Sequence, residues 1–593
     1  MSDVLDPSLR RPGGDRGRGL EPRTLPEMLS RRAALSPHAE AFIWLENGER
    51  EAGRLTFSHL DRRARAIAGL ALARNLAGER VLLAISDGLE LLAALFGCFY
   101  AGATAVVAPP LSSRSAVERL RSIVADSSAA AVLAPENLVA ELGAQLPIHL
   151  QVMSIGSVED EAASAMVSAR DDALAMLQYT SGSTASPRGV MLTHANVLAN
   201  LRALASASDF CEGETAVSWL PLHHDMGLHG FGLFPVFAGM RAVMMPPTAF
   251  LKHPARWLQA IDRYHAVLSA APCFAFDLCR RRVPREARST LDLSSWRVAV
   301  CGGETVRPDV LRGFSEAFAP SGYRHKAFTP AYGLAEATVL ATSPRAGTGF
   351  ATQCVDARSL AEGKVLAPAS SGRARELVVC GVPWSGEVAI VDPNHAKKIP
   401  PGHVGEIWLR GPSVAAGYWG RPSETADTFE ARLGETQGQT WLRTGDVGYM
   451  CDGGLVVTGR RKDMIIVRGA NFDPLDLELA ANRSHSALEG AAAAAFSANA
   501  DDGEQVVLAL EVERVTAQRP DTGEIVAGVV ETLAAEFGLT LFDLAIVRSG
   551  ALPRTTSGKI QRHRCRVEYL NGGLRPLIES RHPALGRWRP SRP

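Results

Sequence analysis

The chain has 593 residues, and its 63 Lys and Arg are balanced by 63 Asp and Glu. A chain of this length is expected to form several structural units and to bury a large core without disulfides or structural metals. The zero net charge argues against nucleic acid or an anionic membrane surface as a partner, because no long-range field would attract the chain to either.

The first 20 residues are rich in Arg, Gly and Asp and lack the apolar run of a signal peptide. We interpret residues 1–20 as a disordered tail. The nine cysteines are scattered along the chain, odd in number and without a CxxC pair. This pattern predicts neither a disulfide framework nor a zinc site, and it favours a reducing, cytoplasmic location.

One uncharged stretch, residues 91–108, is long enough to cross a bilayer. Its first half has a helical pattern, and its second half, TAVVA, is rich in β-branched residues. A buried helix that turns at Ala101-Gly102 into a buried strand explains this stretch better than a membrane span does.

Apolar runs that alternate with helical patterns predict the fold of the first part of the chain. The predicted strands cover residues 81–85, 105–108, 130–134, 174–179, 216–220, 242–245 and 298–301. The helical patterns between them include residues 60–74, 115–126, 194–206 and 254–264. Such alternation indicates parallel-rich sheets covered by helices on both faces, which is an α/β fold.

The pattern changes after Gly386, where short strands separated by Gly and Pro predict a β-rich subdomain. Its strands are expected at residues 386–391, 404–410, 455–458 and 464–467. A small α+β domain should follow, with helices at 476–485 and 524–537 and a strand at 506–512. We therefore expect an N-terminal domain of residues 21–461, with an insertion-like loop at about 344–375, and a C-terminal domain of residues 462–593.

The strongest local signal is the sequence YTSGSTASPRG at residues 179–189. A hydrophobic strand leads into it, and a second strand and a helix beginning near His194 follow it. Glycines let backbone N–H groups crowd around an anion, and hydroxyl groups add further donors. The loop is not a Walker A motif, since GxxxxGK[ST] is absent. It predicts a phosphate-binding loop, with a plain Ser/Gly turn as the alternative.

Four further motifs follow this loop: TPAYGLAEA at 329–337, TGD at 444–446, GRRKD at 459–463 and PRTTSGK at 553–559. With the loop, they resemble in the same order the phosphate, adenine and metal, ribose, hinge and lysine motifs of the adenylate-forming (acyl-activating) superfamily. The resemblance covers residues 55 to 566, nearly the whole chain. It implies a small C-terminal domain that moves relative to the N-terminal domain.

Within the superfamily the chain is most similar to the fatty acyl-AMP ligases. The stretches that carry this similarity are SWLPLHHDMGL at 218–228, residues 250–279, residues 332–339 and the insertion-like residues 354–374. In that family the insertion restricts movement of the C-terminal domain and accompanies poor use of coenzyme A. The family passes its acyl group to a carrier protein of a polyketide or nonribosomal peptide synthase. ATP, Mg²⁺, a fatty acid and such a carrier are therefore the expected ligands and partners.

The resemblance also implies a role for individual residues. Phosphate binding is expected of Thr180, Ser181, Gly182, Ser183, Thr184, Arg188 and Gly189. Adenine and ribose binding is expected of Gly302, Gly303, Glu304, Tyr332, Gly333, Asp446 and Arg460. Catalysis is expected of Lys559 and His224, metal binding of Glu336, and the hinge movement of Lys462. The acyl pocket is expected to include Met226, Gly227, Phe231, Phe274 and Phe276.

The chemistry of carboxylate activation fits these residue types. A carboxylate and a triphosphate repel each other, so the site must supply cations, and Mg²⁺ bridging phosphate oxygens is the usual one. An aromatic face can bury a base, and a carboxylate can accept hydrogen bonds from both ribose hydroxyls. The Lys559 ammonium in the cleft between the domains can stabilise charge on the attacking carboxylate and the α-phosphate.

Several residues allow a second interpretation. Glu336 and Lys559 could be solvated surface residues, Tyr332 could be ordinary core, and Phe274 and Phe276 could belong to the core as well. The adjacent His223, His224 and Asp225 suggest a metal site, but neighbours in one strand or turn do not converge easily on one ion.

The chain departs from the family pattern at three places. Arg188 stands where the loop usually has Lys, CGGET at 301–305 replaces a Gly-Ala-Glu-Pro stretch, and Cys273 follows Pro272 where Asn is commoner. These changes affect the shape of the adenine and acyl pockets rather than the reaction.

We therefore predict an ATP-dependent fatty acyl-AMP ligase. A long-chain fatty acyl-CoA ligase is the nearest alternative, because it would share every motif except the insertion. An amino-acid adenylation domain is usually followed by a carrier domain, and no GxDSL-like serine motif is present. A non-enzymatic sensor or binding protein is disfavoured by the presence of both Lys559 and Glu336.

Overall fold

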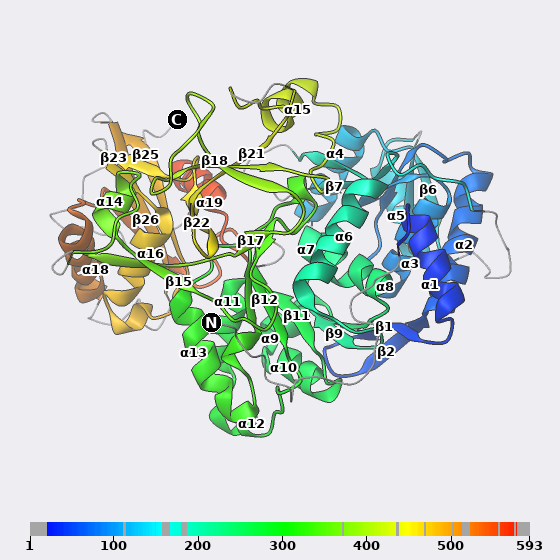
Figure 1. The fold of residues 1–593 in the computed structure, drawn as a ribbon, viewed down its shortest axis with the longest axis horizontal. Helices are drawn as coiled ribbons and strands as arrows, with labels where there is room; N and C mark the ends of the chain where they lie inside the picture. Colours follow the sequence, from blue (N-terminus) through cyan, green and yellow to red (C-terminus); the bar gives the residue numbers. More distant parts are fainter. Residues whose placement is uncertain are drawn as a thin grey trace, which may run out of the picture.

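The computed structural model describes residues 21–110, 114–148, 150–156, 166–179, 187–369, 373–434, 438–467, 470–500, 503–512, 522–555, 558–574 and 577. Its elements form a large N-terminal part and a smaller C-terminal part that lie side by side (Figure 1). The tail predicted at residues 1–20 lies outside the described residues.

The first large sheet has seven strands, and all its neighbouring pairs are parallel except the outermost one. In spatial order its strands are β13 (Phe328–Ala331), β12 (Val298–Gly302), β11 (Leu268–Ala271), β9 (Thr215–Ser218), β10 (Arg241–Met244), β1 (Glu40–Leu45) and β2 (Glu51–Thr56). Its inner strands are short and buried along their length, as expected for parallel strands covered on both faces.

The second large sheet has six strands and ends in an antiparallel pair. In spatial order its strands are β6 (Gln151–Ser154), β5 (Ala131–Ala134), β3 (Arg80–Leu83), β4 (Thr104–Val107), β7 (Leu174–Tyr179) and β8 (Gly189–Thr193). The segment predicted to bind phosphate connects β7 to β8, so it leaves this sheet at its edge.

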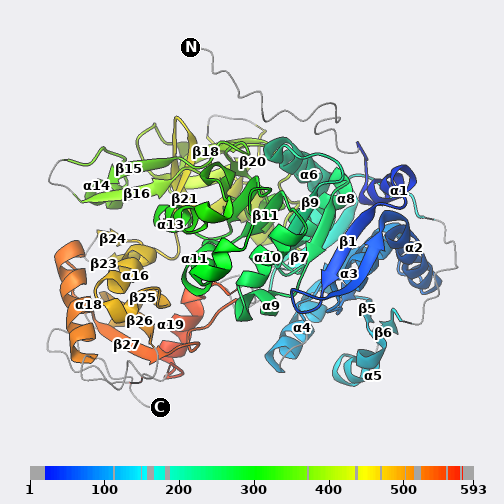
Figure 2. The same ribbon diagram turned by 90° about the horizontal axis from the view of Figure 1, so that it is seen from below.

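Helices cover both sheets and separate them (Figures 1 and 2). The α-helices of this part are α1 (Leu25–Leu35), α2 (Phe57–Ala73), α3 (Gly88–Tyr100), α4 (Arg114–Ser127), α5 (Glu136–Gln145), α6 (His194–Ser208), α7 (Asp225–Gly227), α8 (Phe234–Ala238), α9 (Pro247–Lys252), α10 (Ala255–Arg263), α11 (Cys273–Arg282), α12 (Arg285–Ser289) and α13 (Pro308–Phe318). A π-helix, η2 (Leu228–Leu233), and three 3₁₀ turns, η3 (Ala319–Ser321), η4 (His325–Ala327) and η5 (Ala335–Ala337), complete them.

The uncharged stretch at residues 91–108 forms most of α3 and then β4, with the chain turning at Ala101-Gly102 as predicted. Gly102 has a φ of +67°, a conformation that residues with a Cβ rarely adopt. Among the helices of the described residues, none has the length and apolar character needed to cross a membrane.

The α6 helix connects distant segments through two asparagines. Its capping box joins Thr193 and Asn196, and the Asn196 Nδ2 also donates to the carbonyls of Pro412 and Val414, at 2.9 Å each. The buried Asn200 Nδ2 donates to the carbonyls of Ala337 and Leu340. The side chains of α6 thus fix the loop around η5 and the segment at residues 412–414, which lies between two strands of the β-rich sheet.

The β-rich subdomain predicted after Gly386 is a five-stranded antiparallel sheet. The strand predicted at residues 464–467 is not part of it, since β23 (Ile465–Val467) pairs with β24 (Ala470–Phe472) in the C-terminal part. In spatial order its strands are β19 (Lys397–Lys398), β18 (Glu387–Asp392), β20 (Gly405–Arg410), β21 (Leu442–Cys451) and β22 (Gly454–Arg460). The helix α15 (Pro422–Phe429) lies beside it, and a small pair is formed by β14 (Thr342–Ser343) and β17 (Val382–Pro383).

The insertion-like region contains more regular structure than the sequence pattern predicts. A long antiparallel pair joins β15 (Thr352–Asp356) to β16 (Ala374–Val378), and α14 (Ala357–Ala361) lies between them. Val355, Leu360 and Leu377 pack against Tyr449 and Val456 of the β-rich subdomain. The sequence pattern hides this pairing because the two strands are separated by an irregular loop.

The C-terminal part has a core of its own. Its strands are β25 (Ala493–Ala500), β26 (Gly503–Val512) and β27 (Asp543–Arg548), with a small pair of β23 (Ile465–Val467) and β24 (Ala470–Phe472). Its helices are α16 (Pro474–Arg483), η6 (Ser486–Leu488), α18 (Thr522–Phe537) and α19 (Arg562–Leu570). Separate hydrophobic clusters cover the two faces of the three-stranded sheet.

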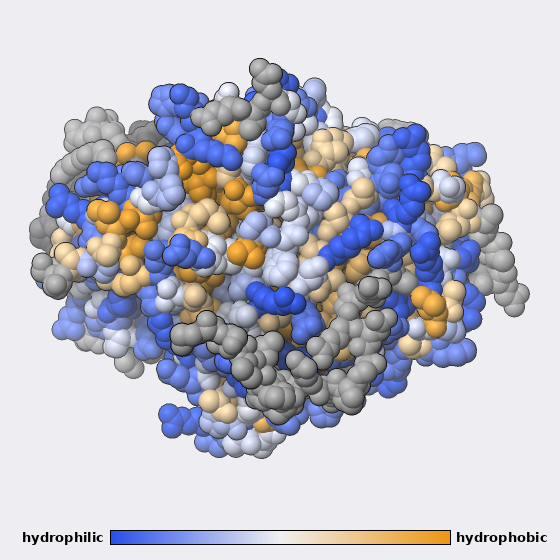
Figure 3. All heavy atoms as spheres, in the orientation of Figure 1, coloured by the Kyte–Doolittle hydropathy of each residue, from blue (hydrophilic) through white to orange (hydrophobic). Residues whose placement is uncertain are grey.

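Figure 3 shows hydrophilic and hydrophobic residues interspersed over one face of the molecule, with the largest hydrophobic grouping toward the upper left. The strands and helices together confirm the predicted α/β class with a β-rich subdomain and a small α+β C-terminal part.

Candidate functional site

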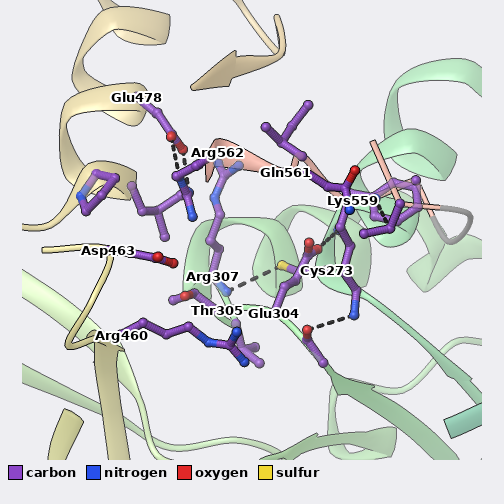
Figure 4. A pocket seen from close by; sticks show the side chains of 18 of the residues that line it. Cys273, Glu304, Thr305, Arg307, Arg460, Asp463, Glu478, Lys559, Gln561 and Arg562 are labelled. Atoms are coloured by element: carbon purple, nitrogen blue, oxygen red, sulfur yellow. Dashed lines mark hydrogen bonds and ion pairs between the residues drawn. The ribbon is translucent and has the colours of Figure 1, made fainter. Parts of the chain in front are cut away.

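A cavity of about 1580 Å³ lies between the N-terminal part and the C-terminal part, and both parts line it. Residues from all four motifs that follow the phosphate loop reach this cavity. Those that the sequence predicted are Arg188, His224, Phe274, Gly303, Glu304, Tyr332, Gly333, Glu336, Asp446, Arg460, Lys462 and Lys559. Figure 4 shows Arg460, Glu304 and Lys559 pointing into this space from different elements.

At one end of the cavity, Asp446 joins the predicted adenine and ribose residues. The Tyr332 hydroxyl donates to Asp446 Oδ2 at 2.8 Å, and Arg460 Nε donates to Oδ1 at 3.0 Å. Burial and the Asp446 carboxylate raise the pKa of Tyr332, and Asp446 raises the pKa of Arg460. The phenol is therefore neutral and the guanidinium charged at neutral pH, so Asp446 is held as an acceptor facing the cavity.

At this end of the cavity, three glycines let the backbone lie close to neighbouring carbonyl groups and to Lys559. A Cβ on Gly302 would lie 2.7 Å from the carbonyl oxygen of Ala331, and one on Gly333 would lie 1.6 Å from that of Val339. Gly303 has a φ of +78°, and a Cβ there would lie 2.8 Å from the Lys559 Nζ. A side chain at Gly302 or Gly333 would collide with a backbone carbonyl, and one at Gly303 would displace the lysine.

Glu336 lies in η5, which Asn200 holds from α6. Its Oε1 accepts a hydrogen bond from the Tyr418 hydroxyl at 2.8 Å, and its carbonyl oxygen accepts one from the Ala415 N–H. Within the described residues no group of three or more potential ligands could hold a metal ion alone. A single carboxylate at the cavity fits Mg²⁺ that completes its coordination with phosphate oxygens and water.

Arg188 lies two residues after the phosphate segment. Its guanidinium pairs with Glu424 at 2.9 Å and lies 5.4 Å from the centre of the Tyr418 ring. Tyr418 thus contacts both Glu336, the predicted metal ligand, and Arg188, the cation predicted to bind phosphate. Gly189 begins β8, while Thr180, Ser181, Gly182, Ser183 and Thr184 lie outside the described residues.

Lys559 crosses the cavity from the C-terminal part. Its Nζ donates to the carbonyl oxygen of Gly303 at 2.7 Å (Figure 4). A tight turn presents it, since the Thr555 N–H donates to the Lys559 carbonyl and the Gly558 N–H to the Thr555 carbonyl. Gly558 adopts a φ of +90°, which this turn requires.

Two ion pairs fix the position of this turn. Arg562 donates two hydrogen bonds to the buried Glu478, at 2.6 and 2.7 Å (Figure 4). Arg554 donates to Glu511 at 2.7 Å. Bidentate Arg–carboxylate pairs define orientation as well as distance. The lysine backbone is therefore anchored on both sides, while its long side chain stays adjustable.

Buried ionisable groups surround the lysine. Burial lowers the pKa of His224 well below its usual value, and the neighbouring His223 and Lys559 add to the effect. Burial raises the pKa of Asp225 and of Glu304, and the charge of Lys559 opposes both shifts. Glu304 accepts a hydrogen bond from the Phe274 N–H, which fixes the first turn of α11 (Figure 4). His224 is thus neutral at pH 7, close to a fixed cation.

The predicted acyl-pocket residues lie in two settings. Phe274 lines the cavity, with its ring centre 6.2 Å from that of Trp219 and its edge against Gly558. Phe276 instead lies fully buried in an aromatic cluster with Trp257, Trp296, Phe314 and Phe328. The structure does not bring Phe276 to the cavity.

The remaining acyl-pocket candidates follow His224. Met226 lies beside Gly303, with its Cε 3.8 Å from the position of a Cβ there. Gly227 packs against the carbonyl of Pro221, where a Cβ would lie at 2.2 Å, and Phe231 is buried in η2. Met226 therefore lies next to Gly303, which lines the cavity, while Gly227 and Phe231 are buried.

Lys462, predicted at the hinge, follows β22 and lines the cavity. Burial lowers its pKa, and the positive charge of Arg460 contributes to the shift. It lies where the chain leaves the β-rich subdomain for the C-terminal part, between β22 and β23.

Sequence reasoning missed several residues that shape this site. Tyr418 lies in GYWGRP, where an aromatic pair bounded by glycines is a recognisable signal. Asn200 is a polar residue on the buried side of a helix, which calls for a hydrogen-bond partner. Glu478 and Arg562 offer no such signal, because 84 residues separate them.

Comparison with protein families identifies two matches along the chain. The AMP-binding enzyme family matches residues 29–419. The family described as the Disco-interacting protein 2-like AMP domain matches residues 462–578. The first match lies within the N-terminal part of the structure, and the second covers most of the C-terminal part.

Individual proteins are similar over nearly the full chain. The medium-chain-fatty-acid–[acyl-carrier-protein] ligase JamA of Moorena producens is 38% identical, over 93% of this chain and 96% of that protein. The long-chain-fatty-acid–AMP ligase FadD32 of Mycolicibacterium smegmatis is 35% identical, over 88% of this chain and 90% of that protein.

Solved structures of fatty acyl-adenylate ligases are also similar to this chain. The fatty acyl-adenylate ligase of L. pneumophila, crystallised with acyl adenylate and pyrophosphate, has a TM-score of 0.74 to this structure and 34% sequence identity. The match covers 93% of this chain and 97% of that one.

Proposed function

The chain belongs to the AMP-binding enzyme family and, within it, to the fatty acyl-AMP ligases, and on that premise we propose that it activates a fatty acid with ATP and passes the acyl group to a carrier protein. The observation that carries this proposal is the position of Lys559, which reaches from the C-terminal part into the cavity that holds Tyr332, Glu336 and Asp446.

In the first step a carboxylate oxygen of the fatty acid attacks the α-phosphorus of ATP. The bond from that phosphorus to the bridging oxygen breaks, and pyrophosphate leaves with the electron pair. Tyr332 and Asp446 hold the adenosine, and Lys559 exchanges its hydrogen bond to Gly303 for the two reacting anions. Mg²⁺ bound at Glu336 would neutralise charge on the phosphates. The buried, neutral His224 borders the same reaction centre.

In the second step the thiol of a carrier's phosphopantetheine attacks the acyl carbonyl. The C–S bond forms, the bond from carbonyl carbon to phosphate oxygen breaks, and AMP leaves as the thiol loses its proton. Lys559 reaches across the cavity to Gly303 in the present arrangement, and we infer that the thiol enters in a different arrangement of the C-terminal part. We place the division between the domains at residues 461 and 462 and the hinge at Lys462.

The insertion supports a preference for a carrier over coenzyme A. Arg375 of β16 pairs with Asp473 at 2.7 Å and with Asp476 at 3.1 Å. Arg373 pairs with Glu536 at 2.7 Å and lies 4.0 Å from the centre of the Phe537 ring. These contacts stabilise one arrangement of the C-terminal domain, and a tenfold shift in population takes only about 1.4 kcal/mol.

Two further features complete the proposal. ATP would bind together with Mg²⁺, which the single Glu336 carboxylate at the cavity would hold. All nine cysteines are free thiols, six of them buried and two partly buried, which supports a reducing, cytoplasmic setting.

The test is an assay of the purified protein with a panel of fatty acids, ATP and Mg²⁺, scored for acyl-AMP, acyl-CoA and acyl-carrier. We expect acyl-AMP with some of these acids, acyl transfer to a carrier that bears phosphopantetheine, and little acyl-CoA. The same carrier without its prosthetic group is the matched control and should remain unloaded. Formation of acyl-CoA as fast as acyl-AMP would show that the protein is an acyl-CoA ligase instead.

A further inference from the structure

The helix that follows His224 runs from the cavity into the interior of the N-terminal part. It is continuous over residues 225–238, through α7, η2 and α8. His224 lines the cavity directly before its first turn. In that turn the Cε of Met226 lies 3.8 Å from the position of a Cβ on Gly303, the hydrogen-bond partner of Lys559. One side of this helix therefore begins at the reaction centre.

The helix contains three glycines, and only two of them are explained by packing. Glycine weakens a helix, so each one calls for a physical reason. A Cβ on Gly227 would lie 2.2 Å from the carbonyl oxygen of Pro221, and one on Gly232 would lie 3.0 Å from Leu92 Cδ2. Apart from its chain neighbours and the backbone of its own helix, no atom of the described residues lies within 4 Å of a Cβ on Gly230. The missing side chain of Gly230 thus leaves space open.

This open space lies on the side of the helix that begins at Met226. Residues four apart lie on one face of a helix, about 6 Å along its axis. Within the helix, Asp225, Met226 and Gly230 are partly exposed, and the other residues are buried. Phe234, four residues further on, is 1% exposed. The face that starts at the cavity therefore stays open as far as Gly230 and is closed at Phe234.

The open face is suited to an apolar ligand. Residues 226–238 contain no Asp, Glu, Lys or Arg. Burial lowers the pKa of His229 to about 3, so its ring is neutral at pH 7. Met226 and Phe234 flank Gly230 on the open face. A hydrocarbon chain gains free energy by leaving water for such surroundings, and apolar walls are typical of ligand pockets.

We propose that Gly230 is a specificity-determining residue, which keeps space open for the chain of the fatty acid along the Met226–Gly230 face and so sets the chain length that the site accepts. The proposal rests on the proposed function, since it takes the cavity as the place where the carboxylate reacts. It assigns medium- or long-chain acids, whose chains extend past Gly230, as the substrate class. Phe231 and Phe276, which the sequence predicted in the acyl pocket, would support it only from the core.

The test is Gly230→Leu, which fills the open space with a branched apolar side chain. The substrates are straight-chain acids from butanoic to hexadecanoic acid, and pyrophosphate release reports acyl-AMP formation. We expect kcat/KM for dodecanoic acid to fall about tenfold or more relative to that for butanoic acid, because the volume of a pocket discriminates by such factors. The dissociation constant of dodecanoic acid, measured by calorimetric titration, should rise by a similar factor.

Gly232 provides a matched control in the same helix. A Cβ there would press on Leu92 of α3 instead of entering open space. Gly232→Ala should therefore lower the melting temperature and leave the preference for chain length unchanged. ATP should bind to both variants as it does to the wild type, because Tyr332 and Asp446 are unchanged. A titration with ATP thus shows that the nucleotide site is intact in each variant.

The outcomes separate a specific role of Gly230 from a general disturbance of the helix. A shift toward shorter acids in Gly230→Leu alone supports the proposal. An unchanged preference in Gly230→Leu, or an equal shift in Gly232→Ala, overturns it. Should Gly230→Leu fail to fold, Gly230→Ala places only a Cβ in the open space, and its melting temperature should stay the same or rise. It should weaken binding of dodecanoic acid about two- to threefold, and a lower melting temperature or unchanged binding would overturn the proposal.

The binding measurement needs no ATP, so it tests Gly230 separately from the proposed activity. Wild-type protein that binds dodecanoic acid without forming acyl-AMP would refute the proposed function, while the variants would still decide the role of Gly230. Wild-type protein that does not bind dodecanoic acid would overturn the assignment of Gly230.

Discussion

Two of the contacts between the C-terminal part and the N-terminal part differ in kind. In the cavity, the end of one flexible side chain makes a single hydrogen bond, from Lys559 to the carbonyl of Gly303. At the insertion, Arg373 and Arg375 form ion pairs with three carboxylates, and Arg373 also covers the Phe537 ring. The first contact must be given up when substrates bind, whereas the second can persist.

This difference indicates a division of roles. A single hydrogen bond from an ammonium to a neutral carbonyl contributes about 1.5–3 kcal/mol and does not define the orientation of the two parts. The partly buried charge pairs and the arginine over an aromatic ring act together and do define orientation. The position of the C-terminal part, and with it that of Lys559, is therefore set largely by the contacts at the insertion. The following predictions perturb one of these two contacts or the backbone that connects them.

The largest effect is expected from Lys559→Ala, which removes the contact in the cavity. Acyl-AMP formation should fall by at least 10²–10³-fold, the usual result of removing a group that stabilises developing charge. ATP should still bind, because Tyr332 and Asp446 remain in place. Pyrophosphate release and ATP titration measure the two properties separately. Near-normal acyl-AMP output would refute the role of Lys559.

Lys462→Pro should have the next largest effect, because it restricts the backbone between the two contacts. Proline fixes φ near −65°, so the C-terminal domain could no longer rotate freely about this residue. Adenylation should stay within about threefold of wild type, while transfer to the carrier falls by about tenfold or more. Single-turnover assays of each half-reaction give the comparison. Equal losses in both would place the hinge elsewhere.

The two contact regions also differ in how far the sequence predicts them. The motif around Lys559 predicts its role, and β7, whose bounds match the predicted strand at 174–179, leads directly to the segment predicted to bind phosphate. The insertion was predicted only as an irregular loop, because its pairing of β15 with β16 spans residues without a repeating pattern. The polar residues that join its end to Asp473, Asp476 and Glu536 carry no sequence signal at all.

The same limit applies inside the site. The sequence predicts that Tyr332, Glu336, Asp446 and Lys559 share one site, since each lies in a recognisable motif. It does not predict Tyr418 as the partner of Glu336, 82 residues away. Contacts over such distances in the chain follow from the packing of sheets and helices, which a local pattern does not encode.

Arg375→Ala tests the insertion contact. Removing the guanidinium leaves Asp473 and Asp476 without their shared cation, and we expect the C-terminal domain to leave its present arrangement more often. Acyl-CoA formation should rise about three- to tenfold, equivalent to about 0.7–1.4 kcal/mol, with acyl-AMP formation retained. Product analysis with the same fatty acid measures both.

Arg358→Ala is the matched control for this variant. Arg358 lies in the same insertion, its side chain is 91% exposed, and its nearest carboxylate is Glu362, one helical turn away. Its replacement should leave the ratio of acyl-CoA to acyl-AMP unchanged. The role of the insertion contact would be contradicted by an equal rise in both variants, or by no rise in either.

The smallest effect is expected from pH, through Asp476. Burial raises the pKa of this carboxyl to about 6, although Arg375 opposes the shift. Asp473 adds to the rise, while Arg373 and Arg483 also oppose it. The ordinary value for an aspartate is about 3.9, which Asp476 should approach when the domain leaves the insertion. The present arrangement therefore binds the proton more tightly than the rotated one.

The sign of the effect follows from this difference in pKa. A carboxyl with a raised pKa favours its buried arrangement when protonated, and that advantage is lost as the pH rises through about 6. Lowering the pH from 7.5 to 5.5 should therefore slow transfer to the carrier about two- to threefold relative to adenylation, because transfer needs the rotated domain. In Asp476→Asn the proton is no longer exchanged, and the ratio of the two rates should lose this dependence. If both proteins show the same pH profile, the Asp476 proton does not control the position of the domain.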